Sequence, residues 1–242
     1  MSSLEIILSS RICDAAIERE PFEHIVIKDF APPVVYQEFV AALPETRNYV
    51  PMTHHDTYAA GRASRLELHL PRDRRELAAI FSGAPSGIDA LGFLGSDTLS
   101  DQLKAKFRIA TDCVSHSNLY RDLEGFDLKP HTDIPDKVIT LGWYLPRDAS
   151  NAESGLALYA ETPRGFVRRS LIPYIPNLVF AFARTDASWH GARHACREPD
   201  ERNSLFVTLY RRSALEGDTL VLADPNIPDR RIPTHSSRRG RP

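Results

Sequence analysis

The sequence predicts an α+β fold in which helices pack outside one sheet of a double-sheet jelly roll, also called a double-stranded β-helix. Helical patterns dominate the first 106 residues, and short β-like runs follow one another from residue 107 to residue 212. Pro, Gly, Asp and Asn punctuate the gaps between those runs, as is typical of strands joined by turns. A chain of 242 residues is long enough for one such domain.

The N-terminal half is predicted to hold helices with two strands between them. An amphipathic helix is expected within the first twenty residues, where Glu5 interrupts the apolar run. Pro32-Pro33 favours the start of a second helix, because proline is tolerated in the first turn. Residues 24–29 are rich in β-branched side chains and residues 65–70 alternate, so both are predicted strands. Further helices are expected at 72–81 and 97–106, and loops at 44–64 and 82–95.

Eight β-like runs follow in the C-terminal half. No helical pattern separates them, which favours a jelly roll or a barrel. The stretch 224–242 has five Arg, four Pro and almost no apolar residues, and is predicted to be a flexible basic tail. The chain is thus divided into one domain at 1–223, with helical support at about 1–106 and a jelly-roll core at about 107–212. The eight predicted strands are 106–110, 114–120, 126–130, 138–145, 155–159, 166–172, 178–183 and 205–210.

Composition argues against several classes of protein. Thirty basic residues against thirty-two acidic ones give a net charge of −2, which offers no basic field for nucleic acid or a membrane surface. No run of 18 apolar residues is present to span a bilayer. Cys13, Cys113 and Cys196 lie far apart without a CxxC motif. They predict free thiols in a reducing cytoplasm rather than a disulfide scaffold or a zinc site.

Three segments of the β region carry chemistry. His131 and Asp133 are two residues apart, so on a strand they face the same way. His190 follows 59 residues after His131, a separation over which a jelly roll can return a strand beside the first. Two His and one carboxylate with open positions are typical of non-heme Fe(II) oxygenases. Arg202 opens a strand, where its guanidinium can hold a carboxylate bidentately, and Ser204 lies on the same face.

Taken together, these motifs resemble the 2-oxoglutarate- and Fe(II)-dependent dioxygenases, particularly their prolyl-hydroxylase-like branch, over about residues 115–211. The resemblance implies that His131, Asp133 and His190 hold Fe(II). It also implies that Arg202, with Ser204 beside it, holds the C5 carboxylate of 2-oxoglutarate.

Two tyrosines extend the resemblance. Tyr144 looks like the family's second ligand for the co-substrate carboxylate. Tyr120, eleven residues before His131, resembles a tyrosine that lines the co-substrate pocket. Ser154-Gly155 departs from the pair of glycines usual in the family. The implied reaction is hydroxylation of a substrate with O2 and 2-oxoglutarate, releasing succinate and CO2, and we expect a small metabolite or natural-product intermediate as substrate.

Alternative site residues and alternative functions remain at this point. A second HxD occurs at His54-His55-Asp56 in a predicted loop, and His194 could replace His190 as the distal ligand. A cupin-like binding module without catalysis, or a metal-dependent hydrolase, would use the same three ligands. Neither needs Arg202, so that residue discriminates between them and a dioxygenase.

Substrate contacts are expected from outside the β framework. The stretch 44–64 is long for a connection without regular structure, and such loops are often functional. We therefore expect residues 45–70 to form a substrate lid, with Tyr58 and Arg62 as contacts and Trp189 as a pocket wall.

Overall fold

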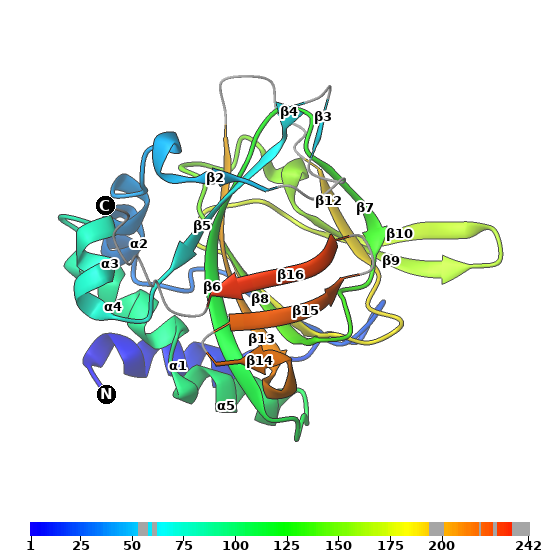
Figure 1. Cartoon of the computed structure of the whole chain (residues 1–242), viewed down its shortest axis with the longest axis horizontal. Coiled ribbons are helices and arrows are strands. Elements are labelled where there is room, and N and C mark those ends of the chain that lie inside the picture. Colours follow the sequence, from blue (N-terminus) through cyan, green and yellow to red (C-terminus); the bar gives the residue numbers. More distant parts are fainter. Residues whose placement is uncertain (53–57, 60–61, 194–200, 218, 225–226, 234–242) are drawn as a thin grey trace.

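The protein folds into two main antiparallel sheets, with helices on the outer face of the larger one, and two minor sheets of three and two strands (Figure 1). The computed structural model describes residues 1–52, 58–59, 62–193, 201–217, 219–224 and 227–233. The predicted α+β class is confirmed, as are antiparallel strands and helices outside one sheet.

The larger sheet has seven strands in the order β1-β11-β8-β13-β6-β5-β2. The smaller sheet has the order β10-β9-β12-β7, and its β9–β10 hairpin projects from the body (Figure 1). The seven strands are β1 (His24–Ile27), β2 (Val50–Pro51), β5 (Arg65–Leu70), β6 (Cys113–Asp122), β8 (Lys137–Tyr144), β11 (Val179–Ala183) and β13 (Arg202–Arg211). The other four are β7 (Asp127–His131), β9 (Leu156–Thr162), β10 (Gly165–Ile172) and β12 (His190–Arg193).

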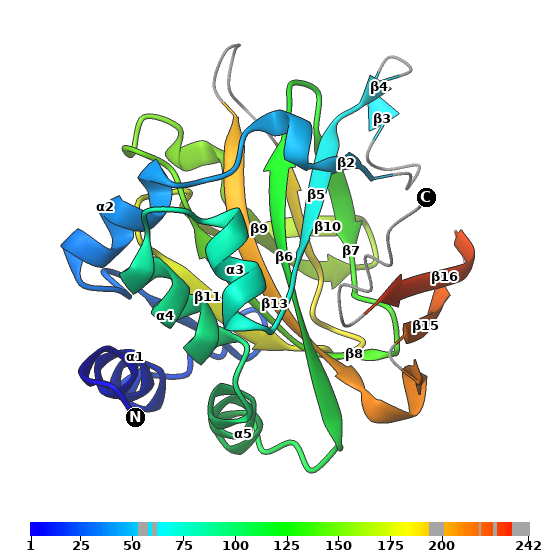
Figure 2. The same cartoon turned by 60° about the vertical axis from the view of Figure 1, so that its left-hand side comes forward.

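Side-chain alternation divides the larger sheet into two faces. One face presents Leu141, Trp143 and Leu205 to the helices, and these side chains are fully buried in the main core. Trp143 stacks on Phe39 at 5.3 Å between ring centroids. The other face looks toward the smaller sheet. The helices on the first face are α1 (Ser3–Asp14), α2 (Pro33–Ala41), α3 (Arg74–Ile80), α4 (Pro85–Leu94) and α5 (Asp97–Lys106) (Figure 2).

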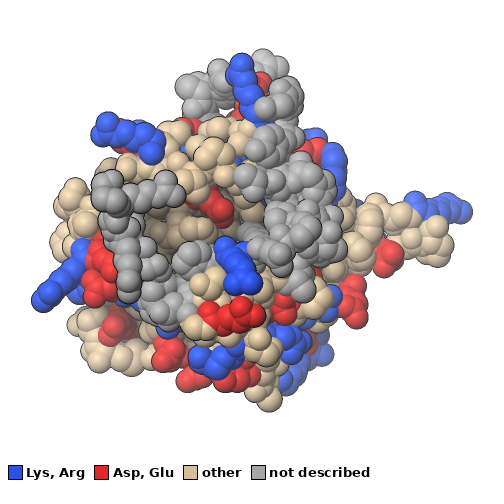
Figure 3. Space-filling view, in the orientation of Figure 1, with Lys and Arg blue, Asp and Glu red and all other residues tan. Residues whose placement is uncertain are grey.

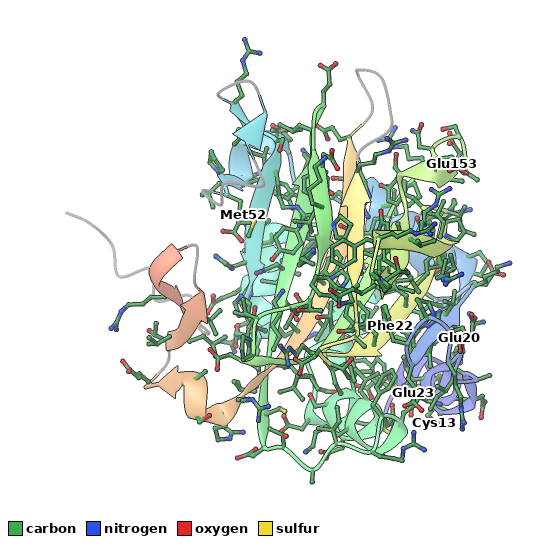
Figure 4. The ribbon with its side chains drawn as sticks, turned by 90° about the vertical axis from the view of Figure 1, so that its right-hand side faces the viewer. Cys13, Glu20, Phe22, Glu23, Met52 and Glu153 are labelled. Atoms are coloured by element: carbon green, nitrogen blue, oxygen red, sulfur yellow. The ribbon has the colours of Figure 1, made fainter. Side chains whose placement is uncertain are left out.

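A second apolar cluster fills the space between the two sheets. Phe180 and Phe182 of β11 meet Leu158 of β9 there. Phe22, labelled in Figure 4, packs edge-on against Phe182 with ring centroids 5.6 Å apart. This cluster holds the inner faces together, so polar side chains on those faces share one enclosed space.

Two predicted elements are wrong. Residues 82–95 are not a loop, because the apolar helix α4 buries Ile88, Leu91 and Phe93. Gly87 lets this helix approach α2, since a Cβ there would lie 2.9 Å from a ring carbon of Phe39. Residues 106–110 are not a strand: α5 ends at Lys106, and the chain then turns through a positive φ at Arg108.

Two predicted irregular regions contain short elements. The stretch 44–64 holds a 3₁₀ turn η1 (Thr46–Asn48), β2, and the pair β3 (Tyr58–Ala59) and β4 (Arg62–Ala63). The predicted tail from residue 224 is partly ordered, because β16 (Ile227–Pro233) pairs with β15 (Thr219–Asp224). Beside them lie η4 (Arg212–Ala214) and β14 (Leu215–Glu216), while η3 (Ala152–Ser154) precedes β9.

Cys13 and Cys113 are free thiols, while Cys196 lies outside the described residues. Among the helices that the structure describes, none has the length and apolar character needed to cross a membrane.

Candidate active site

Strands β7 and β12 bring the three predicted metal ligands together. His131 and His190 are direct partners in the register of these strands, and their ring centroids lie 4.4 Å apart. Asp133 follows β7 by two residues. One ligand atom from each of the three side chains falls within 4.8 Å of the others. Gly191 permits the close pairing, since a Cβ there would lie 2.6 Å from the carbonyl oxygen of Leu128.

Hydrogen bonds orient both imidazoles toward a common point. Nδ1 of His131 donates to the carbonyl of Lys129 at 2.9 Å, and Nδ1 of His190 donates to the carbonyl of Ser188 at 2.9 Å. A carbonyl only accepts, so each Nδ1 carries hydrogen and each Nε2 keeps its lone pair in the neutral ring. Burial lowers the pKa of His190 to about 4, so this ring is neutral near pH 7.

Asp133 is fixed by two donors. Its Oδ2 accepts from Thr140 Oγ1 at 2.8 Å, and its Oδ1 accepts from Lys137 Nζ at 2.6 Å. Burial by itself would raise the pKa of Asp133, but the ammonium of Lys137, with smaller effects of His190 and His131, holds it well below its usual range. The carboxylate is therefore ionised, and each oxygen retains a lone pair for a cation.

The predicted co-substrate anchor lies at one end of the inner face. Arg202 is 1% exposed, and its Nε donates to the carbonyl of Ser154 at 2.5 Å. Its guanidinium carbon lies 5.1 Å from the ring centroid of Tyr144 and 5.2 Å from that of Tyr174. Burial tends to lower the pKa of Arg202, but Tyr144 and Asp122 raise it overall, so the group is a fixed cation.

Asp122 is a site residue that the sequence analysis missed. It is fully buried and lies between two guanidinium groups. Its Oδ2 accepts from Arg202 Nη1 at 2.5 Å and from Arg65 Nη2 at 3.0 Å, and its Oδ1 accepts from Arg65 Nε at 2.5 Å. Burial alone would raise the pKa of Asp122, but Arg65 and Arg202 lower it. Two cations and one anion leave this end of the face with one net positive charge.

Two hydroxyl groups beside Arg202 lack hydrogen-bond partners among the described residues. Tyr144 Oη and Ser204 Oγ are both buried, and the two residues are register partners on β8 and β13. Burial raises the pKa of Tyr144 to about 12, so its phenol keeps its proton. An unpaired buried hydroxyl is costly, and a ligand carboxylate next to Arg202 would satisfy both.

Tyr120 lies on the same face as these groups, since Ser204 pairs with Tyr120 on one side and with Tyr144 on the other. Its Oη accepts a hydrogen bond from Asn118 Nδ2 at 3.0 Å, and its ring stacks on the guanidinium of Arg65 at 4.7 Å. Tyr120 and Tyr144, the two tyrosines predicted to bind or line the co-substrate, therefore each pack on one of the two guanidinium groups that are hydrogen-bonded to Asp122.

Aromatic side chains connect the metal ligands to the anchor. The ring of His190 lies 4.7 Å from Phe182, Phe182 stacks with Phe180 at 6.4 Å, and Phe180 lies 5.2 Å from Tyr144. The three ligands and the Arg202 pocket therefore border one apolar cluster between the sheets. Figure 3 shows a hollow over β5 and β6, with acidic atoms within it.

The predicted substrate residues are not shown to contact the metal ligands or the Arg202 group in the described part of the chain. Trp189 packs on Phe166 of the projecting hairpin, with ring centroids 4.5 Å apart, whereas its neighbour His190 packs on Phe182. Arg62 is exposed on β4. The alternative ligands His54, His55, Asp56 and His194, the side chain of Tyr58 and much of the expected lid lie outside the described residues.

Three residues of the site escaped the sequence analysis: Asp122, Lys137 and Thr140. Arg65 falls in the substrate lid expected at 45–70, whereas the structure pairs it with Asp122. Lys137 and Thr140 follow Asp133 by four and seven residues, a spacing that signals nothing by itself. Asp122 and Arg65 become recognisable only through strand pairing, since Asp122 on β6 is the register partner of Arg65 on β5 and of Arg202 on β13.

Comparison with solved structures gives the same fold. A prolyl hydroxylase from Trichoplax adhaerens, solved in complex with a hypoxia inducible factor oxygen degradation domain peptide fragment, matches with a TM-score of 0.56 and 14% identity, over 87% of this chain and 90% of that one. A prolyl-4-hydroxylase from Pseudomonas putida matches with a TM-score of 0.57 and 15% identity, over 85% of this chain and all of that one. No family model and no curated protein sequence matches the chain. The chain therefore has the fold of prolyl hydroxylases.

Proposed function

We propose that this protein is an Fe(II)- and 2-oxoglutarate-dependent dioxygenase that hydroxylates a small metabolite or natural-product intermediate. On this proposal the two facing sheets are the double-stranded β-helix of such enzymes. The observation that carries the proposal is a pair of features on the two inner faces that look toward each other, one on each main sheet. An open set of two His and one Asp borders the same apolar cluster as a buried Arg202 with two unpaired hydroxyls.

The donor set fits the metal. His131, Asp133 and His190 would hold Fe(II) through neutral imidazole nitrogens and an ionised carboxylate, a set that leaves three positions open. The iron, when bound, supplies the activation of O2 and of the keto acid.

The anchor end fits a carboxylate. Arg202 has five N–H donors, and Ser154 and Asp122 occupy two of them, so donors remain for a ligand. Tyr144 Oη and Ser204 Oγ would donate to the same carboxylate. Tyr120 accepts from Asn118, which leaves its own hydroxyl hydrogen to donate elsewhere in the pocket.

Two alternatives compete with this proposal. A cupin-like module would bind metal without turnover, and a metal-dependent enzyme of another class would not use 2-oxoglutarate. Neither gives a reason for a buried cation and two hydroxyls that lack partners among the described residues, on the inner face opposite the metal ligands.

The test is a substrate-library screen with iron, ascorbate and 2-oxoglutarate that reads succinate against a no-substrate control. We expect iron-dependent succinate formation that a substrate increases, and loss of that signal in His131→Ala. Purified protein that binds iron but forms no succinate with any substrate, and none without substrate, would support a binding module instead.

A further inference from the structure

Strand β5 carries a carboxylate on the inner face that the proposed reaction does not use. Glu67 is the register partner of Tyr120 and lies two residues from Arg65, so all three share the face that looks into the site. Its side chain is 15% exposed. Its Oε2 is buried and has no hydrogen-bond partner in the part of the chain that the structure describes.

Nearby cations do not neutralise Glu67. The guanidinium of Arg65 is committed to Asp122 through Nε and Nη2, and the ammonium of Lys137 is committed to Asp133. The Nε2 atom of His69 is 4.0 Å from Glu67 Oε1, which is longer than a hydrogen bond.

The side chain of His69 is hydrogen-bonded to other residues and not to Glu67. Its Nδ1 donates to Asn118 Oδ1 at 2.7 Å, because an amide oxygen only accepts. The other ring nitrogen, Nε2, lies too far from Glu67 Oε1 to donate a hydrogen bond to it. Asn118 in turn donates to Tyr120 Oη, so this chain of side chains is satisfied without Glu67.

Charge therefore differs along the inner face. The end near Arg202 has a net positive charge and suits the co-substrate carboxylate. Glu67 lies one strand beyond Tyr120 and adds a carboxylate to the same inner face. Figure 3 shows acidic atoms within the hollow over β5 and β6. A buried carboxylate without a partner is stabilised most by a charged donor.

We infer that the substrate carries a cationic nitrogen, an ammonium or a guanidinium group, and that Glu67 binds it. This inference rests on the proposed function, because it names the substrate class of the same site. Glu67 is then the residue that selects cationic molecules over neutral and acidic ones of the same shape.

The experiment uses three pairs of probes, each a cation with a neutral molecule of similar shape. The pairs are L-arginine with L-citrulline, L-lysine with L-norleucine, and putrescine with 1,4-butanediol. Succinate formation is measured with each probe for the full-length protein loaded with iron and 2-oxoglutarate. The same measurements are made on Glu67→Gln and on Glu124→Gln, an exposed carboxylate on the turn after β6 that serves as the control.

We expect at least one cationic probe to raise succinate formation above the substrate-free rate while its neutral partner does not. In Glu67→Gln the KM for that probe should rise about 10- to 100-fold, the range for one charge-assisted hydrogen bond, and Glu124→Gln should match the wild type. The inference is overturned if a neutral partner works as well, if no cationic probe stimulates, or if Glu67→Gln leaves KM unchanged. Succinate formation that needs iron but no substrate, and that is lost in His131→Ala, tests the proposed function separately. If this activity is present but no probe increases it, only the substrate class is rejected.

Discussion

Replacing Asp122 with Asn tests whether one buried carboxylate organises the co-substrate pocket. The substitution keeps the shape of the side chain but removes its charge and replaces one acceptor oxygen with a donor NH2 group. Asp122 accepts three hydrogen bonds from Arg65 and Arg202, all within 3.0 Å, at 0% exposure. Breaking a buried ion pair on one side costs about 3–5 kcal/mol, because the remaining charge stays buried without its partner.

We therefore expect Asp122→Asn to lower the free energy of unfolding by about 3–5 kcal/mol. The variant should also raise the KM for 2-oxoglutarate about tenfold or more, with a smaller change in kcat, since Arg202 loses the carboxylate that positions it. Urea unfolding and 2-oxoglutarate titration measure the two effects. The control is Asp112→Asn, whose pair with Arg212 is 70% and 54% exposed and should contribute less than about 1 kcal/mol. An Asp122→Asn protein with unchanged unfolding and unchanged KM would refute the reasoning.

Further predictions concern the anchor, acid stability and the metal. Arg202→Lys keeps a charge but loses the planar fork, so we expect a 10- to 100-fold rise in the KM for 2-oxoglutarate, whereas titrations that overlay the wild type would exclude Arg202 as the anchor. Tyr144→Phe removes one hydroxyl, and 2-oxoglutarate titration should show a smaller rise in the same KM. The pKa of Asp122 is lower in the folded protein than in the unfolded chain, so its contribution to stability is complete above the unfolded-state pKa of about 3.9 and is lost as the pH falls below that value. In urea unfolding, the difference in free energy of unfolding between the wild type and Asp122→Asn should therefore shrink below about pH 4. Alanine at His131, Asp133 or His190 should abolish iron-dependent turnover and stoichiometric iron binding while the circular dichroism spectrum is retained. Stoichiometric iron and full activity in all three variants would refute the assignment of these residues as metal ligands.

The parts of the fold with a clear local pattern could be predicted from the sequence. Residues 65–70 alternate, and they form β5. Pro32 caps α2 and Pro33 begins it, as expected. The helix α4 could not be predicted in this way, because Gly87 and Gly92 indicate a loop locally. Its stability comes from packing, in which Gly87 meets Phe39 of another helix.

The residues of the candidate site likewise fall into those with a local sequence signal and those without one. The i, i+2 spacing of His131 and Asp133 is a local signal, and Arg202 two residues before Ser204 is another. Asp122 carries no local signal, because its role arises from pairing with residues 57 and 80 positions away. Glu67 likewise appears as a plain polar position of an alternating strand until the structure shows which side chains lie around it.

One site is expected to bind both a metal, through His131, Asp133 and His190, and a dicarboxylate, through Arg202. Equilibrium dialysis with Mn(II), used as an inert substitute for iron, and labelled 2-oxoglutarate measures the binding of both. We predict one Mn(II) and one 2-oxoglutarate per chain, with each ligand raising the affinity for the other by the same factor. If 2-oxoglutarate does not bind, or binds equally tightly with and without metal and in Arg202→Lys, the metal ligands and Arg202 do not form one site.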